Sequence, residues 1–133
     1  MNIEIFKKVT KRKEDGDIVG IAISKKPEYQ QELKNLKIKF NDLVKKLETD
    51  NLKAINLDEK YQNSGYYKKY FWERLIFNDE YRYEDFSIWI GLDEKGLSVY
   101  LGTSDEFSLD RSIVIKYCKS KLGDGATFHN FTF

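Results

Sequence analysis

The most regular hydrophobic pattern in the chain lies in residues 27–49. Six apolar residues recur there at intervals of four, three, four, three and four positions: Tyr29, Leu33, Leu36, Phe40, Leu43 and Leu47. This spacing places all six on one side of an α-helix. Pro27 suits the first turn of that helix, where an N–H group would have no partner within the helix. The sequence therefore predicts one long amphipathic helix over residues 27–49, packed on one face of a sheet.

The same apolar stripe has a second interpretation, as a seam for a partner helix. It would then join two copies of this chain, or this chain and another protein. Three heptads are short for a coiled coil, however, and the flanking positions carry no obvious charge code. We expect the helix to cover the chain's own sheet, with a homodimer through residues 27–49 as the alternative.

Two β-hairpins are predicted from alternating residues. The first joins a strand over residues 2–10 to a strand over residues 18–24, with a turn at Asp15 and Gly16. The aliphatic residues expected to face the long helix come from both hairpins: Val19, Ile21, Ile23, Ile88, Ile90, Val99 and Leu101.

The second hairpin joins residues 86–92 to residues 97–103. If its four-residue turn pairs the strand ends, Trp89 lies opposite Tyr100 on the face away from the aliphatic residues. Their neighbours on that face are all small: Ser87, Gly91, Ser98 and Gly102. This pattern predicts a shallow aromatic platform that can take a flat ligand, a base or a partner's side chain. The structural alternative is a cross-strand pair that only shields the glycines or is itself covered by residues 66–77.

Three further elements complete the expected fold. Residues 66–77 are rich in aromatics and are interpreted as a second helix, with a strand as the alternative. Residues 109–122 predict a helix that ends at Gly123, and residues 127–133 predict a last strand. The order β-β-α-(α)-β-β-α-β predicts a single α+β domain over residues 1–133, with an antiparallel sheet of about five strands.

Composition is consistent with one globular domain. The chain has 133 residues, of which 41% are hydrophobic and 34% charged. No apolar run approaches the ~18 residues of a membrane span, and the first residues lack the apolar core of a signal peptide. We therefore expect a cytoplasmic protein with no membrane contact.

Charge is divided unevenly along the chain. Residues 1–69 carry 16 basic and 11 acidic side chains, a net charge of +5, and residues 70–133 carry 7 basic and 11 acidic ones, a net charge of −4. A basic cluster near the first turn is a candidate for contact with nucleic acid: Lys7, Lys8, Lys11, Arg12 and Lys13. Acidic residues in the same turn dilute this cluster, and lysines on an edge strand also block aggregation.

Residues 78–85 form an acidic and aromatic segment around one arginine. Its candidate partner-binding residues are Asp79, Glu80, Tyr81, Tyr83, Glu84 and Asp85. Tyrosine is enriched at protein interfaces, and clustered carboxylates can steer the chain toward a basic partner. The same composition also suits a solvated loop.

The sequence offers little for catalysis. His129 is the only histidine and Cys118 the only cysteine, so a histidine-rich metal site is excluded and a catalytic histidine dyad is not expected. Cys118 falls within the predicted helix 109–122, far from the helix start that would activate a thiol. No glycine-rich phosphate loop is present. We expect neither a metal nor a cofactor.

The leading hypothesis is therefore a small non-enzymatic protein-binding module. In size, charge density and aromatic content the chain is comparable to bacterial immunity proteins and to phage inhibitors of bacterial defence, which antagonise toxins or other enzymes. Its contacts would be the six residues of the acidic segment together with Trp89 and Tyr100. The alternatives are nucleic-acid binding through the basic N-terminal hairpin, and binding of a small nucleotide-like ligand on the Trp89/Tyr100 face.

Overall fold

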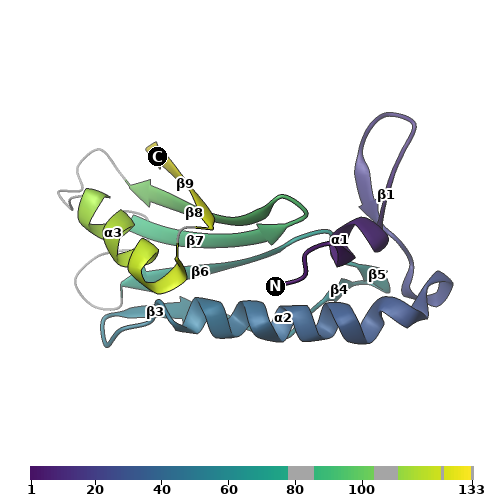
Figure 1. The fold of residues 1–133 in the computed structure, drawn as a ribbon, viewed down its shortest axis with the longest axis horizontal. Helices are drawn as coiled ribbons and strands as arrows, with labels where there is room; N and C mark the ends of the chain where they lie inside the picture. Colours follow the sequence, from purple (N-terminus) through teal and green to yellow (C-terminus); the bar gives the residue numbers. More distant parts are fainter. Residues whose placement is uncertain (78–85, 104–110, 124, 133) are drawn as a thin grey trace.

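The computed structural model describes residues 1–77, 86–103, 111–123 and 125–132. They form a five-stranded sheet with two helices on one side and a pair of small hairpins at one end (Figure 1). The helices are α1 (Ile5–Lys8), α2 (Gln30–Lys45) and α3 (Arg111–Leu122), with single 3-10 turns η1 (Ile23–Lys25) and η2 (Pro27–Tyr29). The strands are β1 (Thr10–Arg12), β2 (Ile18–Gly20), β3 (Leu52–Ile55), β4 (Gln62–Asn63), β5 (Tyr66–Tyr67), β6 (Phe71–Phe77), β7 (Phe86–Asp93), β8 (Gly96–Thr103) and β9 (Ala126–Thr132).

The large sheet has the strand order β3-β6-β7-β8-β9. The first four strands are antiparallel, but β9 runs parallel to β8. The expectation of a purely antiparallel sheet is therefore corrected. A parallel neighbour requires a crossover connection, and α3 provides it between β8 and β9. The predicted register of the β7–β8 hairpin is confirmed, because Trp89 pairs with Tyr100.

Helix α2 confirms the prediction made from the apolar stripe, although its regular part is shorter. The 3-10 turn η2 precedes it and contains Pro27, and the α-helix ends at Lys45. The next turn tightens, since the N–H of Leu47 donates to the carbonyl of Val44 at 3.0 Å. Predicted helix 109–122 is confirmed as α3, where Gly123 has a positive φ of 79° and its N–H closes on the carbonyl of Lys119 at 2.8 Å.

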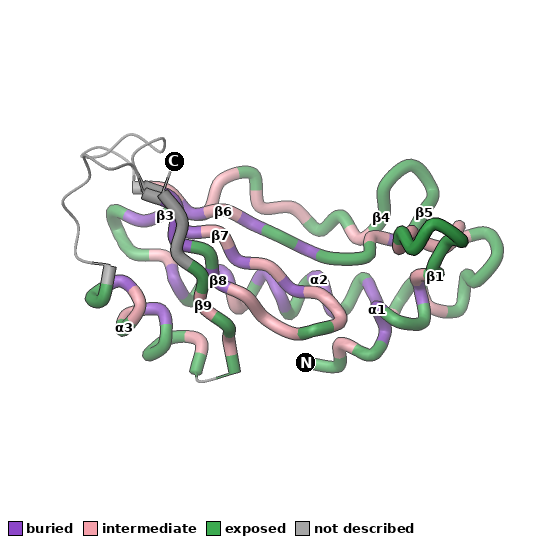
Figure 2. The backbone as a smooth tube through the Cα atoms, turned by 90° about the horizontal axis from the view of Figure 1, so that it is seen from above, coloured by how far each residue is buried: buried purple, intermediate pink, exposed green. Residues whose placement is uncertain are grey.

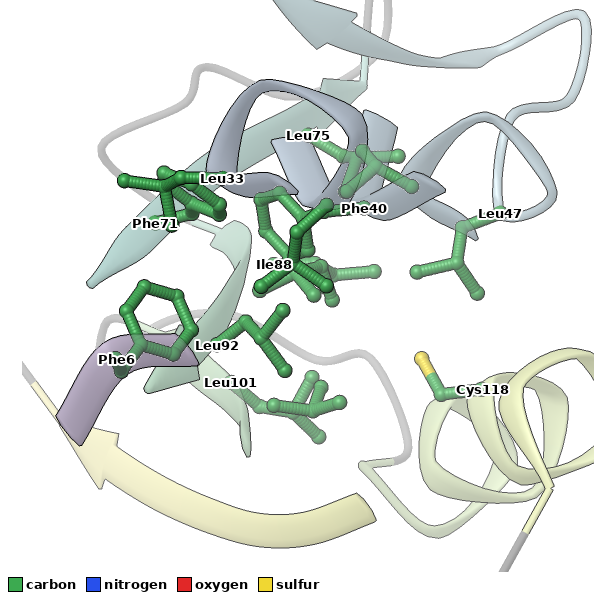
Figure 3. Packing of buried hydrophobic residues seen from close by; sticks show 14 of the residues in the cluster. Phe6, Leu33, Phe40, Leu47, Phe71, Leu75, Ile88, Leu92, Leu101 and Cys118 are labelled. Carbon is green, nitrogen blue, oxygen red and sulfur yellow. The ribbon is translucent and has the colours of Figure 1, made fainter. Parts of the chain in front are cut away.

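The core lies between α2 and the inner face of the sheet (Figure 3). The stripe residues Leu33, Leu36, Phe40 and Leu47 are buried against inward residues of the strands. Chief among those inward residues are Phe71, Leu75, Ile88, Ile90, Leu92, Val99 and Leu101. Because the chain's own sheet occupies the stripe, a coiled coil on it would have to displace this core; the homodimer stays an untested prediction.

One polar pair interrupts this apolar layer. The ammonium group of Lys37 on α2 lies 2.6 Å from the carboxylate of Glu73 on β6, and both residues are buried. Lys37 also donates to Asn41 at 3.0 Å, and Asn41 donates to the carbonyl of Asp58 at 2.6 Å. The lysine is thus paired and hydrogen-bonded, which is the condition under which a buried charge is tolerated.

The N-terminal prediction is wrong in part. Residues 2–10 contain the short helix α1 rather than a strand, because buried Ile5 and Val9 are four positions apart and fit one helical face. The hairpin turns at Gly16 as predicted, but β1 and β2 form a separate two-stranded sheet (Figure 1). Val19, Ile21 and Ile23 therefore do not line the face of the large sheet.

The helix predicted over residues 66–77 is also wrong, and the strand alternative is confirmed for most of it. The segment contains β5 and β6. Along β6, buried Phe71, Glu73 and Leu75 alternate with the more exposed Trp72 and Arg74, an alternation that Figure 2 displays along the tube. This period of two requires a strand.

Removing one member of the buried pair should destabilise the protein strongly. We expect Glu73→Ala to lower the free energy of unfolding by about 3–5 kcal/mol, because it leaves the ammonium of Lys37 buried without a counter-charge. The double variant Lys37→Met with Glu73→Leu should recover most of that loss. Urea denaturation measures both. Lys39→Met, at an exposed position of α2, is the control and should change stability by less than about 0.5 kcal/mol. A cost below about 1 kcal/mol for Glu73→Ala would contradict the assignment.

Candidate functional site

The face of the sheet that points away from α2 carries a row of aromatic and cationic residues. Arg74, Trp89, Tyr100 and His129 are direct neighbours across β6, β7, β8 and β9. Trp72 precedes Arg74 by two positions and lies on the same side of β6. We call this surface the outer face. Each of its residues alternates with an inward core residue, so strand geometry alone places them together.

The rings of the outer face stack in two pairs. Trp72 and Trp89 have ring centroids 4.8 Å apart and planes inclined by 18°. Tyr100 and His129 have centroids 4.6 Å apart and an angle of 14°. The guanidinium carbon of Arg74 lies 4.8 Å from the centre of the Trp89 ring. Trp89 is therefore half-buried between its neighbours, whereas the Trp72 indole remains 51% exposed.

A groove of about 580 Å³ lies beside this aromatic row. Its floor contains Gly91 and Ser98, and its walls include Trp72, Trp89 and Tyr100. Tyr70 and Asp93 also line it. The volume falls within the roughly 300–1,000 Å³ of ligand pockets, and the combination of aromatic walls with few polar groups is typical of them. The groove is therefore a candidate binding site on the outer face.

Gly91 keeps the groove open. A Cβ placed on this glycine would lie 3.9 Å from the Tyr100 ring and 3.9 Å from the carbonyl oxygen of Phe71. These are ordinary contact distances, so the strand itself would accept a side chain here. A glycine inside a strand often marks the close approach of a ligand. Glycine at position 91 is therefore not needed to avoid a steric clash within the sheet. Its effect is to leave space for the groove.

The predicted partner-binding residues divide into two groups. Trp89 and Tyr100 lie on the outer face, paired as expected, and Tyr100 is 38% exposed. The other six lie outside the described residues: Asp79, Glu80, Tyr81, Tyr83, Glu84 and Asp85. The predicted pairing on one face is therefore confirmed, but Trp72 and Arg74 of β6 cover part of Trp89, as the alternative to an open platform expects. The expected acidic neighbour stays a prediction.

The basic cluster expected near the first turn comes from two consecutive elements, α1 and the β1–β2 hairpin. Lys7 and Lys8 belong to α1, where Lys7 lies 3.6 Å from Glu4 and Lys8 lies over the Tyr29 ring. Lys11, Arg12 and Lys13 belong to β1 and its turn, and Arg12 donates to the carbonyl of Gly16 at 2.8 Å. The insertion of α1 separates the five cations onto two elements.

The candidate residues predicted from sequence do not include four residues of the site: Tyr70, Trp72, Arg74 and His129. The first three fall in the segment predicted as a helix, and His129 was considered only for metal binding and catalysis. The signal that could have found them is the alternation Phe71, Glu73, Leu75 in β6, which leaves Trp72 and Arg74 on the opposite face. The parallel pairing that brings His129 onto Tyr100 has no comparable local signal.

The described residues provide little reactive chemistry. Cys118 is buried in the core, and burial raises the pKa of its thiol from 9.0 to about 11. A thiol in this state is a poor nucleophile, because the thiolate is the reactive form. Within the described ranges, no group of three or more His, Cys, Asp or Glu residues could hold a metal ion. None of the described helices is long and apolar enough to cross a membrane.

Comparison with protein-family models, with curated proteins and with solved structures found no match for the chain. The function therefore has to be argued from the outer face itself.

The buried thiol predicts a loss of stability in alkaline solution. The unfolded thiol ionises near pH 9.0 and the folded one near 11, so the folded state is favoured below pH 9 and loses this advantage as the pH rises to 11. Ionisation of Cys118 should lower the free energy of unfolding by about 2–3 kcal/mol over this pH range. Burial also raises the pKa of Tyr67 and Tyr117, which acts in the same direction.

Denaturation curves between pH 8 and pH 11 measure this effect. Cys118→Ala isolates the thiol, since it should be less stable at pH 8 but should lose less stability on going to pH 11. Equal losses in the two proteins would refute the role of the thiol.

Proposed function

We propose that this protein is a non-enzymatic binding module that holds a planar heterocyclic ring, of the nucleobase type, in the groove above Gly91 and Ser98. The observation that carries the proposal is the half-exposed Trp72 indole beside a glycine floor. Exposed apolar surface that is gathered at one place commonly marks an interaction site. A bound ring would bury this surface.

Stacking supports a flat ligand. The outer-face rings already pair at centroid distances of 4.6–4.8 Å and with nearly parallel planes. Parallel offset packing of aromatic rings stabilises a pair by about 0.5–1.5 kcal/mol beyond burial. A further planar ring can extend such a stack from Trp72 or Tyr100. An aliphatic ligand would gain free energy from burial of its apolar surface but would lack the contribution from stacking.

Polar groups at the groove support a heterocycle rather than a plain hydrocarbon ring. Ser98 offers a hydroxyl group that can donate or accept, and the Asp93 carboxylate can accept. One Asp93 oxygen already accepts from the N–H of Lys95 at 2.8 Å, which fixes its position. A few such groups in an aromatic groove fix the orientation of a ligand.

The protein-docking hypothesis keeps a test of its own. An inhibitor or immunity-type role through residues 78–85 predicts that Tyr81→Ala with Glu84→Ala releases any captured partner protein. A partner that remains bound to this double variant would refute that contact. This role would share Trp89 and Tyr100 with the groove, so the double variant tests the contribution of residues 78–85 alone.

Calorimetric titration with the four common nucleoside monophosphates tests ring binding. Loss of one stacking partner costs about 1–3 kcal/mol, so Trp72→Ala should weaken binding about 5- to 160-fold. Trp72→Phe should retain part of the affinity, because a ring remains. Ile113→Ala, at an exposed apolar position on α3, is the matched control and should leave binding unchanged.

Gly91→Val provides a second test, which adds a side chain to the groove instead of deleting one. A branched side chain suits a strand and would fill the floor of the groove, so binding should be lost while the thermal unfolding temperature stays close to that of the wild type. Unchanged affinity in both Trp72→Ala and Gly91→Val would overturn the proposal, as would the absence of binding to any of the four nucleotides.

A further inference from the structure

The segment 66–74 leads away from the groove and carries both aromatic rings and cations. On its solvent side lie Tyr66, Lys68, Lys69, Tyr70, Trp72 and Arg74, whereas Tyr67, Phe71 and Glu73 are buried. Glu73 is the only acidic residue of the segment, and its carboxylate is turned inward onto Lys37. The surface of this segment therefore presents three rings and three positive charges without an acid.

Trp72 connects the groove with two further hollows. One, of about 460 Å³, is lined by Tyr66, Tyr70, Lys68 and Lys69 together with residues of β2. The other, of about 350 Å³, is lined by Lys68 and Arg74 and also by the acidic residues Asp58 and Glu73. Trp72 lines the groove and both hollows, so the three lie next to one another around this indole, and we refer to them together as the path.

The cations of this path lie beside rings. The ammonium of Lys69 lies 5.9 Å from the centre of the Tyr70 ring and donates to the carbonyl of Ile18 at 3.0 Å. The hydrogen bond to Ile18, the first residue of β2, holds the Lys69 side chain next to Tyr70. Rings that can stack on bases, interleaved with cations that can meet phosphates, are the two components of single-strand recognition.

Acidic residues lie close to one side of these hollows. Asp93 and Glu94, where β7 meets the turn to β8, line a hollow of about 210 Å³ together with Lys95, Lys69 and Tyr70. The hollow of Tyr66 and Tyr70 has two lysines and no acidic lining residue. A polyanion would therefore be held better in this second hollow, at Lys68 and Lys69, than beside the turn.

We infer that the outer face and the segment 66–74 together bind single-stranded nucleic acid, with one base in the groove, a neighbouring base on Tyr70 or Tyr66, and phosphates at Lys68 and Lys69. This inference rests on the proposed ring-binding function of the groove. It assigns the nucleic-acid contact to residues 66–74 and not to the N-terminal hairpin. Paired bases cannot stack on these rings, so a duplex is a poor ligand.

Fluorescence anisotropy with a labelled single-stranded 8-mer tests the inference, in parallel with a mononucleotide. A platform of this kind covers about 4–16 nucleotides, so an 8-mer spans it. We expect the 8-mer to bind at least tenfold more tightly than the mononucleotide at low salt. The logarithm of its binding constant should fall with the logarithm of salt concentration with a slope of about −1.4, as two phosphate contacts require.

Charge variants locate the contact. Lys68→Gln and Lys69→Gln should each reduce the salt slope by about 0.7. Lys39→Gln, at an exposed position on α2 and away from the outer face, is the matched control and should leave the slope unchanged. The double variant Lys11→Gln with Lys13→Gln tests the N-terminal hairpin by the same measurement of the salt slope.

The outcomes separate this inference from the function on which it rests. A mononucleotide that binds through Trp72 and Gly91, with no gain and no salt dependence for the 8-mer, would overturn the inference and leave the proposed function intact. A slope that changes with Lys11 and Lys13 but not with Lys68 and Lys69 would move the contact to the hairpin and overturn the assignment. Equal affinity for duplex and single strand would overturn it as well. Binding by neither ligand would remove both proposals.

Discussion

The buried ion pair between Lys37 and Glu73 fixes the orientation of β6, and the outer face depends on that orientation. Side chains alternate along a strand, so a shift of one residue would turn Glu73 outward and bring Trp72 into the core. The ammonium of Lys37, 2.6 Å from Glu73, would then be buried without a counter-charge. An apolar residue at position 73 could also give a stable core. The one-residue shift of β6 would then cost less free energy than it does with the ion pair. The polar pair therefore specifies one register of a strand whose two faces both carry aromatic rings.

The aromatic face has an energetic cost. Leaving half of a large apolar side chain such as Trp72 in water forgoes roughly 1 kcal/mol of burial or more. The fold limits this loss by stacking, since Trp89 is covered by Trp72 and by the guanidinium of Arg74. The aromatic surface that remains exposed lies around Gly91 at the floor of the groove. This distribution distinguishes the outer face from scattered surface hydrophobics, which require no explanation.

Sequence patterns predicted the elements whose periodicity is local and unambiguous. The stripe of α2 and the β7–β8 hairpin have a single sensible period, and both are confirmed with the expected faces. Residues 66–77 were misassigned because tyrosine and phenylalanine suit both helices and strands, and because Glu73 occupies a core position normally filled by an apolar residue. The presence of Lys37 on the buried stripe of α2, one turn from Leu33, was the complementary signal. Trp89 and Tyr100 could thus be paired from sequence, whereas Trp72 could not join them until the phase of β6 was known.

The same reasoning explains why the site is rigid although much of it is open to solvent. Four of its rings project from consecutive strands of one sheet, and each strand is held by core residues that alternate with them. Tyr66 and Tyr70 lie outside the large sheet, in and after the short strand β5, which the β1–β2 unit contacts through the N–H of Tyr67 and the carbonyl of Ile21 at 3.0 Å. The groove is therefore preorganised, and the path beyond it depends on smaller contacts. A ligand that occupies both would gain affinity because the rings of the groove are already held in place before it binds.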